Sequence, residues 1–170
     1  MPQRLNLHLS PPVRTIILIW LAWLVIVLGY QTLVSQRMGI DRPDYALMWT
    51  PTETGRTSQR DKPYLNDPFM NRQVSWDSEF YLSIATVGYD DPAVRTTLVK
   101  DGRELSLNYA FFPLYPAVMR GVSLPLRLLN LTPIATSTLA GVIVSLLGTL
   151  AAMLALYDLT RGTLDDAGGI

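Results

Sequence analysis

Two long runs without a charged residue constrain this chain more than any other feature of its sequence. No Asp, Glu, Lys or Arg occurs in residues 15–36, a run of 22, or in residues 128–157, a run of 30. A helix of about 20 residues crosses the hydrocarbon core of a bilayer, so each run is long enough to span it. The segment between them holds 11 of the 14 basic and 11 of the 14 acidic residues. We therefore expect an integral membrane protein with transmembrane helices at 15–36 and 132–158.

The first run is apolar on all sides, which distinguishes it from an amphipathic surface helix. It is longer than the apolar region of a usual signal peptide, and no small-x-small cleavage site follows, so we interpret it as an uncleaved anchor. Residues 1–14 contain Arg4 and Arg14 and no acid, which predicts a cytoplasmic N-terminus. This orientation places residues 37–110 outside the cytoplasm and residues 159–170 inside, in a multi-pass protein of the cell membrane.

The second run begins with a helix-start signal and carries a stripe of small residues. Thr132 is a suitable N-cap, and Pro133 suits the first helical position because its missing N–H costs nothing there. Small side chains recur at spacings of three and four: Thr138, Gly141, Ser145, Gly148, Ala152 and Ala155. Such a stripe lets a neighbouring helix approach closely, although small residues are also simply common in membrane helices.

The polar loop between the runs changes character near its middle. Residues 37–72 are rich in proline and show no periodicity, so we expect irregular structure there. Residues 76–87 then place their large apolar side chains on one helical face, from Trp76 to Val87. Ser75 is a plausible N-cap and Gly88 a plausible stop for this helix. Its apolar face suits a membrane interface or, alternatively, packing against other parts of the loop.

A second aromatic segment follows at residues 108–116, with the sequence NYAFFPLYP. Its two prolines disfavour a regular helix there, whereas its aromatic rings suit the headgroup level of a bilayer. Residues 111–130 have the length of a span, but Arg120 near the centre would be costly in lipid. We expect an interfacial or re-entrant segment; a true span would instead place the C-terminus outside.

Asp77 is the best candidate for chemistry. It lies in the first turn of the predicted helix, where the helix dipole favours its ionised form, and a carboxylate there is a suitable base for a sugar hydroxyl. The alternative role is simple helix stabilisation. Asp90 and Asp91 fit turn residues before a proline better than catalytic groups.

Other kinds of chemistry find little support in the composition. The only histidine, His8, lies in the predicted cytoplasmic segment, and there is no cysteine. Any metal site would therefore be all carboxylate; we predict no cofactor and leave a divalent metal open. The balance of 14 basic and 14 acidic residues gives no basic surplus for nucleic acid.

The two aromatic segments together resemble the first-loop signature of the PIG-V family of mannosyltransferases and its bacterial relatives. They are WDSEFYLSIATVGY at residues 76–89 and NYAFFPLYP at residues 108–116, in the family's order and between two spans. The resemblance covers residues 74–160 and implies an all-α membrane glycosyltransferase of the GT-C type. The acidic residue that such enzymes use in the first outer loop would be Asp77. Site-shaping positions would be Trp76, Tyr81, Gly88, Tyr89, Phe111, Phe112, Pro113, Tyr115 and Pro116.

The resemblance also implies a reaction. A sugar would pass from a polyprenyl-phosphate donor to a glycan or glycolipid acceptor, by inverting transfer with Asp77 as the base. Cationic side chains would stabilise the departing phosphate, and Arg120 has the best position among the candidates Arg72, Arg95, Lys100, Arg103 and Arg120. Its alternative role is snorkelling to lipid headgroups.

The chain is much shorter than members of that family, so we expect it to be their N-terminal portion and inactive by itself. The rival interpretations are a non-catalytic membrane subunit or transporter fragment that binds lipid-linked glycans, and a signal-anchored structural protein.

Overall fold

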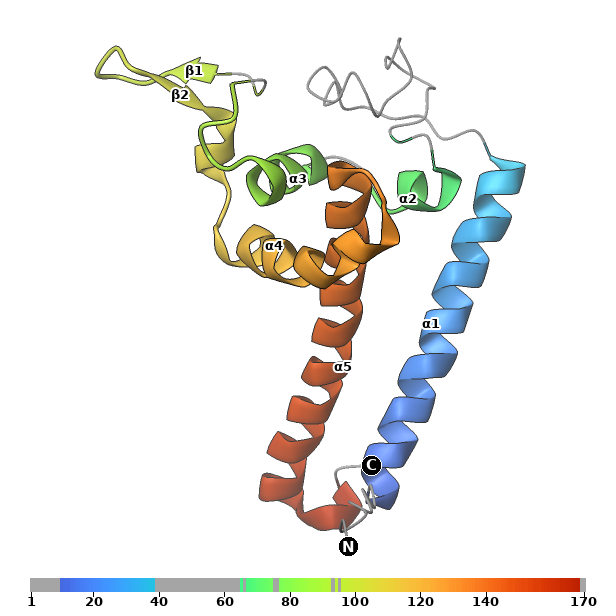
Figure 1. Cartoon of the computed structure of the whole chain (residues 1–170). Coiled ribbons are helices and arrows are strands. Elements are labelled where there is room, and N and C mark those ends of the chain that lie inside the picture. Colours follow the sequence, from blue (N-terminus) through green and yellow to red (C-terminus); the bar gives the residue numbers. More distant parts are fainter. Residues whose placement is uncertain are drawn as a thin grey trace, which may run out of the picture. The chain divides into compact units, whose positions relative to one another are not determined.

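The computed structural model describes residues 10–38, 65, 67–74, 77–92, 94 and 96–168. These residues are mostly helical and form two compact units, one of Met1–Val34 with Leu146–Ile170 and one of Ser35–Ser145. The long helix α5, Pro133–Gly168, contributes its first turns to the second unit and the rest to the first (Figure 1).

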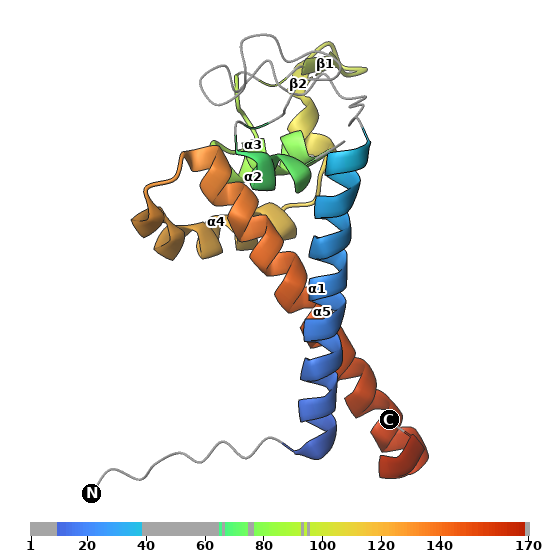
Figure 2. The ribbon, with the colours of Figure 1, turned by 90° about the vertical axis from the view of Figure 1, so that its right-hand side faces the viewer.

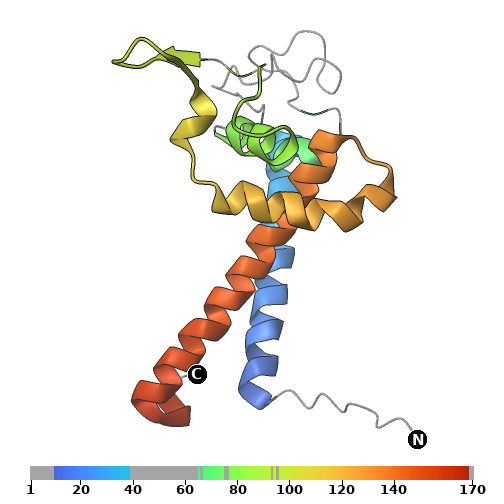
Figure 3. The same ribbon diagram turned by 60° about the vertical axis from the view of Figure 1, so that its left-hand side comes forward.

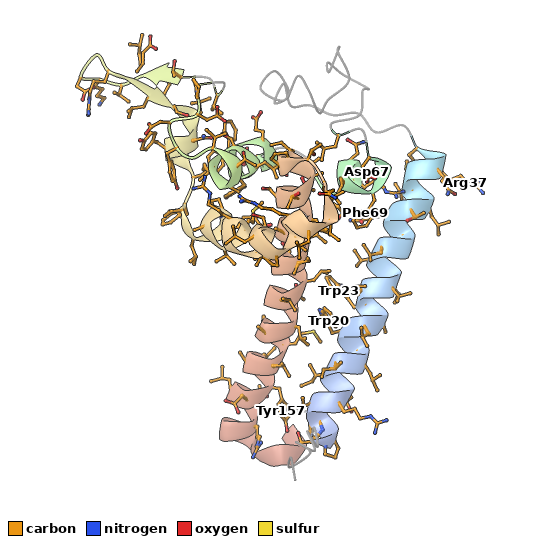
Figure 4. All side chains as sticks on the ribbon, in the orientation of Figure 1. Trp20, Trp23, Arg37, Asp67, Phe69 and Tyr157 are labelled. Carbon is orange, nitrogen blue, oxygen red and sulfur yellow. The ribbon has the colours of Figure 1, made fainter. Side chains whose placement is uncertain are left out.

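The first unit consists of α1, Pro11–Arg37, and the C-terminal part of α5, which run in opposite directions (Figure 1, Figure 2). Trp20 lies on the side of α1 that faces α5, and its indole Nε1–H donates to the carbonyl oxygen of Leu146 across 3.1 Å (Figure 4). An indole N–H in apolar surroundings needs such a partner, because an unpaired polar group costs free energy where water is absent.

Both long helices can cross a bilayer by length and composition, over Pro11–Val34 and Pro133–Arg161. Their apolar side chains are largely exposed: Val25 and Ile26 of α1 are each 68% exposed, and Leu159 of α5 is 69% exposed. A helix that is apolar all round and uncovered by protein suits lipid better than water. This arrangement agrees with the predicted pair of spans.

Both helices extend beyond the predicted spans. The first begins at Pro11 rather than at residue 15, because proline is favoured in the first turn, where its missing N–H has no helical partner. At the start of the second, Thr132 Oγ1 accepts from the N–H of Ala135 across 3.2 Å, so the predicted cap is confirmed. The helix continues beyond the predicted span, to Gly168.

The second unit packs short helices around the start of α5. α2 (Pro68–Arg72) and α3 (Ser78–Thr86) come first, and α4 (Leu114–Leu126) with the 3₁₀ turn η3 (Arg127–Leu129) follows a β-hairpin. α3 packs on α4, and α4 runs across the first turns of α5 (Figure 1, Figure 3). The shared core consists of Leu65, Met70, Val74, Leu82, Ala85, Met119, Ile134 and Ala140.

The helix predicted at residues 76–87 is α3, and it is buried on more than one face. Six of its nine residues are buried, including Leu82 and the polar Ser83, whereas Val87 lies beyond the helix and is 57% exposed. The prediction of a single apolar face that extends to Val87 was therefore wrong. Packing against other parts of the loop, one of the two alternatives, accounts for the burial. The stop at Gly88 is confirmed, since its φ of 127° is a conformation that favours glycine.

A small antiparallel hairpin departs from the all-α prediction. Strand β1, Thr96–Leu98, pairs with β2, Glu104–Ser106, in a register that places Thr96 opposite Ser106. The connecting turn contains Asp101 and Gly102, and Gly102 has a φ of 82°. An Asp-Gly pair is a recognised hairpin signal, and helical periodicity does not reveal it.

Helix α2 corrects the expectation that residues 37–72 are irregular throughout. Asp67 Oδ1 accepts from the N–H of Met70 across 2.8 Å, and Pro68 occupies the first helical position. An Asp cap followed by Pro is a helix-start signal in the sequence. Most of the remainder of 37–72 lies outside the described residues.

The segment predicted at residues 111–130 contains α4, whose 13 residues extend about 20 Å. That is too short to cross a hydrocarbon core of about 30 Å, so the alternative of a third span is not favoured. Pro113 is its N-cap, and Pro116 lies in the first turn, where proline is tolerated. The helix therefore starts between the two prolines that were expected to prevent it.

Only the first part of the small-residue stripe on α5 is covered within the described chain. A Cβ atom at Gly141 would meet Met119 Cε and the Tyr115 hydroxyl, each at 3.1 Å, whereas one at Gly148 would meet nothing within 4 Å. Within the described chain, the stripe therefore has a close neighbour at Gly141, and that neighbour is α4.

Candidate functional site

Asp77 occupies the N-cap position of α3, one residue before the helix, rather than its first turn as predicted. The predicted cap Ser75 lies outside the described residues. The backbone oxygen of Asp77 accepts from the N–H groups of Phe80 (3.1 Å) and Tyr81 (3.5 Å), but its carboxylate makes no capping hydrogen bond. The side chain is exposed. A carboxylate so placed is accessible to a ligand and is held at the positive end of the helix dipole.

Beside Asp77, aromatic rings from two motifs meet: the aromatic segments at residues 76–89 and 108–116. The Phe80 ring of α3 stacks on Phe111 with centroids 4.6 Å apart, and Tyr81 meets Phe111 edge-on at 5.2 Å. Tyr81 also meets Tyr115 edge-on at 5.4 Å. Since Tyr81 is one helical turn beyond Asp77, the carboxylate and this aromatic cluster lie on the same side of α3.

The Tyr115 hydroxyl ties the aromatic cluster to α5. It lies 3.2 Å from the carbonyl oxygen of Gly141, to which it donates, and 3.1 Å from Ser145 Oγ. A Cβ atom at position 141 would lie 3.1 Å from this hydroxyl, closer than an ordinary contact, so glycine suits the approach.

Tyr89 makes a second link between the motifs. Its hydroxyl donates to the Phe111 carbonyl oxygen across 2.9 Å, and its ring lies 5.1 Å from that of Tyr109. Tyr89 therefore orients the backbone at the start of the second motif. Phe112, by contrast, is 85% exposed and lies outside the aromatic cluster, and Trp76 falls outside the described residues.

A buried polar network, which the sequence did not suggest, holds the two motifs together. The Ser83 hydroxyl donates to Asp91 Oδ2 across 2.8 Å, and Asn108 Nδ2 donates both to Ser83 Oγ (2.8 Å) and to the Gly88 carbonyl oxygen (3.1 Å). Ser83 and Asn108 are fully buried and Asp91 nearly so. The interpretation of Asp91 as an ordinary turn residue was wrong, because its carboxylate is part of this network.

Asp90 has a different role from its neighbour. Its Oδ1 accepts from the Tyr109 hydroxyl across 2.8 Å at the surface. This hydrogen bond raises the pKa of Tyr109 above its usual 10.0, because the bond is lost when the phenol ionises next to a carboxylate.

Arg120 caps the C-terminal end of α3. Its Nε donates to the Ala85 carbonyl oxygen across 3.0 Å, and one terminal nitrogen donates to the carbonyl oxygens of Thr86 and Val87. These carbonyls have no helical partner, so a guanidinium there satisfies them and complements the negative end of the helix dipole. The sequence did not suggest that Arg120 contacts the end of α3. A role for Arg120 in binding substrate stays a prediction.

Two of the other predicted cations lie in the turn of the hairpin. Arg103 Nε is 2.7 Å from Asp101 Oδ2 in the turn of the hairpin, where Lys100 also lies. Arg95 falls outside the described residues. In the part of the chain that the structure describes, no group of three or more His, Asp or Glu side chains is placed to hold a metal ion.

Comparisons with models of protein families, with curated proteins and with solved structures found no match to this chain.

Proposed function

We propose that this chain forms part of a membrane glycosyltransferase of the GT-C type, related to the PIG-V mannosyltransferases, in which Asp77 is the catalytic base. The observation that carries the proposal is the meeting of the two motifs. Residues 76–89 and 108–116 contact one another through Phe80, Tyr81 and Phe111, and the exposed Asp77 carboxylate lies one turn from that contact.

The chemistry follows from this arrangement. Asp77 takes the proton of an acceptor hydroxyl as its oxygen attacks the anomeric carbon of the donor sugar. The bond between that carbon and the phosphate oxygen breaks, the anomeric configuration inverts, and polyprenyl phosphate leaves. Aromatic faces such as those of Tyr81 and Tyr115 suit the apolar faces of a sugar ring and the first isoprene units of the donor.

The proposed setting is the outer face of the cell membrane. The two apolar helices anchor the chain, and the Arg residues before the first predict that the loop with Asp77 lies outside the cytoplasm. The donor and the acceptor would both reach the loop from the bilayer surface.

Transfer of mannose from a polyprenyl-phosphate donor, measured in membranes with and without the change Asp77→Asn, tests the proposal. Loss of transfer in the variant supports it. Retained transfer with a correctly inserted protein contradicts it, and favours the rival interpretation of a non-catalytic subunit that binds lipid-linked glycans.

A further inference from the structure

A pocket opens at the end of α3 opposite Asp77, where α3, α4 and the start of α5 come together. It has a volume of about 350 Å³ and is lined by Ala85, Thr86, Ser123, Arg127, Asn130, Leu131, Pro133, Thr136 and Ser137. All these residues belong to the second unit. None is acidic and one, Arg127, is cationic, so the lining favours an anion.

Three side chains of the lining have hydrogen-bond donors without a partner among the described residues: Arg127, Asn130 and Ser137. Ser137 is only 3% exposed as a residue, but its hydroxyl is not one of the fully enclosed side-chain atoms. Because Ser137 lines the pocket, the pocket is where this hydroxyl can meet a partner. Asn130 is held in a left-handed conformation, with a φ of 52°, between η3 and α5.

The remaining hydroxyls of the lining are already engaged as donors. Thr86 donates to the carbonyl oxygen of Leu82, Ser123 to that of Arg120 and Thr136 to that of Thr132. Thr132 also caps the first turn of α5, so the helix adds the positive end of its dipole rather than free N–H groups. Among the described residues of the lining, the donors that remain available to a ligand are therefore the Arg127 guanidinium, the Asn130 amide and the Ser137 hydroxyl.

The surroundings of the pocket are apolar. Leu128 is 87% exposed, and Leu129 and Leu131 beside it are also exposed. A polar, cationic pocket rimmed by uncovered leucines fits the boundary of a bilayer, where phosphate headgroups lie above acyl chains.

We propose that this pocket binds the phosphate group of a membrane lipid, with Arg127, Asn130 and Ser137 as its ligands. The site is distinct from the proposed reaction centre. The nine residues of α3 separate the pocket from Asp77 by about 13 Å along the helix, too far for a phosphate bound here to leave a sugar attacked at Asp77. The proposal therefore does not rest on the glycosyltransferase assignment.

The test is a binding titration of the whole chain in neutral detergent. One arm uses a short-chain phosphatidic acid, whose headgroup is a phosphate monoester, and the other uses inorganic phosphate. Saturable binding is expected in the lipid arm. Arg127→Gln and Ser137→Ala should each weaken it by about 10-fold or more, since hydrogen bonds to a charged group are among the strong ones.

Arg103→Gln is the matched control, because Arg103 is an exposed arginine of the same unit whose partner is Asp101 in the hairpin. It should bind like the unaltered chain. Arg127→Lys should recover part of the affinity lost in Arg127→Gln. If inorganic phosphate binds as tightly as the lipid and with the same dependence on Arg127, the proposal of a lipid ligand is overturned, and the pocket is a site for free phosphate.

Absence of saturable binding in both arms would overturn the proposal. So would equal weakening by Arg103→Gln, which would indicate attraction by net charge alone. Circular dichroism and gel filtration of each variant separate loss of the site from loss of the fold, and Ser137→Ala, which removes a single oxygen atom, retains the packing.

Discussion

The Asn108 side-chain amide donates a hydrogen bond to the Ser83 hydroxyl oxygen across 2.8 Å, and both residues are completely buried. Ser83 lies in the first aromatic motif and Asn108 begins the second, so this bond joins segments 25 residues apart in the sequence. The same amide also donates to the Gly88 carbonyl oxygen just beyond α3.

Replacing Asn108 with alanine should therefore destabilise the second unit. The change leaves the Gly88 carbonyl and the Ser83 hydroxyl oxygen without this donor, and an unsatisfied buried polar group costs about 1–3 kcal/mol. Thermal unfolding of the detergent-solubilised protein should show a lowered midpoint. Asn108→Asp should also be unfavourable, since it places a second carboxylate near Asp91. The surface change Lys100→Ala, in the hairpin turn, is the control, and a midpoint as low as that of Asn108→Ala would contradict the argument.

The change Asp77→Asn should abolish most sugar transfer without affecting insertion or folding. Asparagine has nearly the same shape but takes up no proton at neutral pH, and general-base catalysis contributes about 100- to 10,000-fold. We expect transfer from a polyprenyl-phosphate donor to fall by at least about 100-fold. The activity is measured in membranes that contain whatever further segments the enzyme requires.

Asp101→Asn is the matched control for Asp77, because Asp101 is an exposed acid in the hairpin turn, away from the aromatic cluster. It should transfer sugar at the normal rate. Asp91 is unsuitable as a control, since its carboxylate is buried in the network with Ser83. Near-normal turnover by Asp77→Asn would show that another group is the base.

Two glycines of α5 should respond differently to the same substitution. Leucine at position 141 would collide with Met119 and Tyr115, and such overpacking typically costs about 1–3 kcal/mol. Leucine at position 148 meets open space within the described chain and should leave the unfolding midpoint unchanged. A loss of stability in Gly148→Leu as large as that in Gly141→Leu would reveal a neighbour at position 148 in the assembled protein.

The pair of Asp90 and Tyr109 makes a prediction about alkaline pH. Their hydrogen bond raises the pKa of Tyr109 above 10.0, so the folded state holds the phenol proton more tightly than the unfolded state does. The stabilisation is fully present below pH 10 and is lost as the pH rises through the folded-state pKa. Asp90→Asn should lower that pKa towards 10.0. Ultraviolet titration of tyrosinate, with Tyr109→Phe as the blank, measures the change; an unaltered curve would show that the bond does not form in solution.

The orientation in the membrane is testable with single cysteines, because the chain has none of its own. A cysteine in place of Thr97, exposed on the hairpin, should react with a membrane-impermeant thiol reagent in intact cells. A cysteine in place of Ser10 should react only after the membrane is permeabilised. The reverse pattern would invert the topology that Arg4 and Arg14 predict.

The sequence by itself determined those features that depend on one stretch of chain. The two apolar helices follow from the length of their charge-free runs, whatever they pack against. Likewise, the start of α5 follows from Thr132 and Pro133, and the stop after α3 from Gly88, because caps act on neighbouring residues. The position of Asp77 at a helix start was visible for the same reason, to within one residue.

Contacts between distant residues were decided only by the tertiary structure. Arg120 caps α3 from 33 to 35 residues away, and Tyr115 packs on Gly141 from 26 residues away. No periodicity in a single sequence encodes which arginine meets which carbonyl, because that depends on how α4 lies on α3 and α5. The same holds for the burial of Asp91 and for the pocket at Ser137. Asp91 and Ser137 look like surface residues in the sequence, but segments that pack over them place them in the interior.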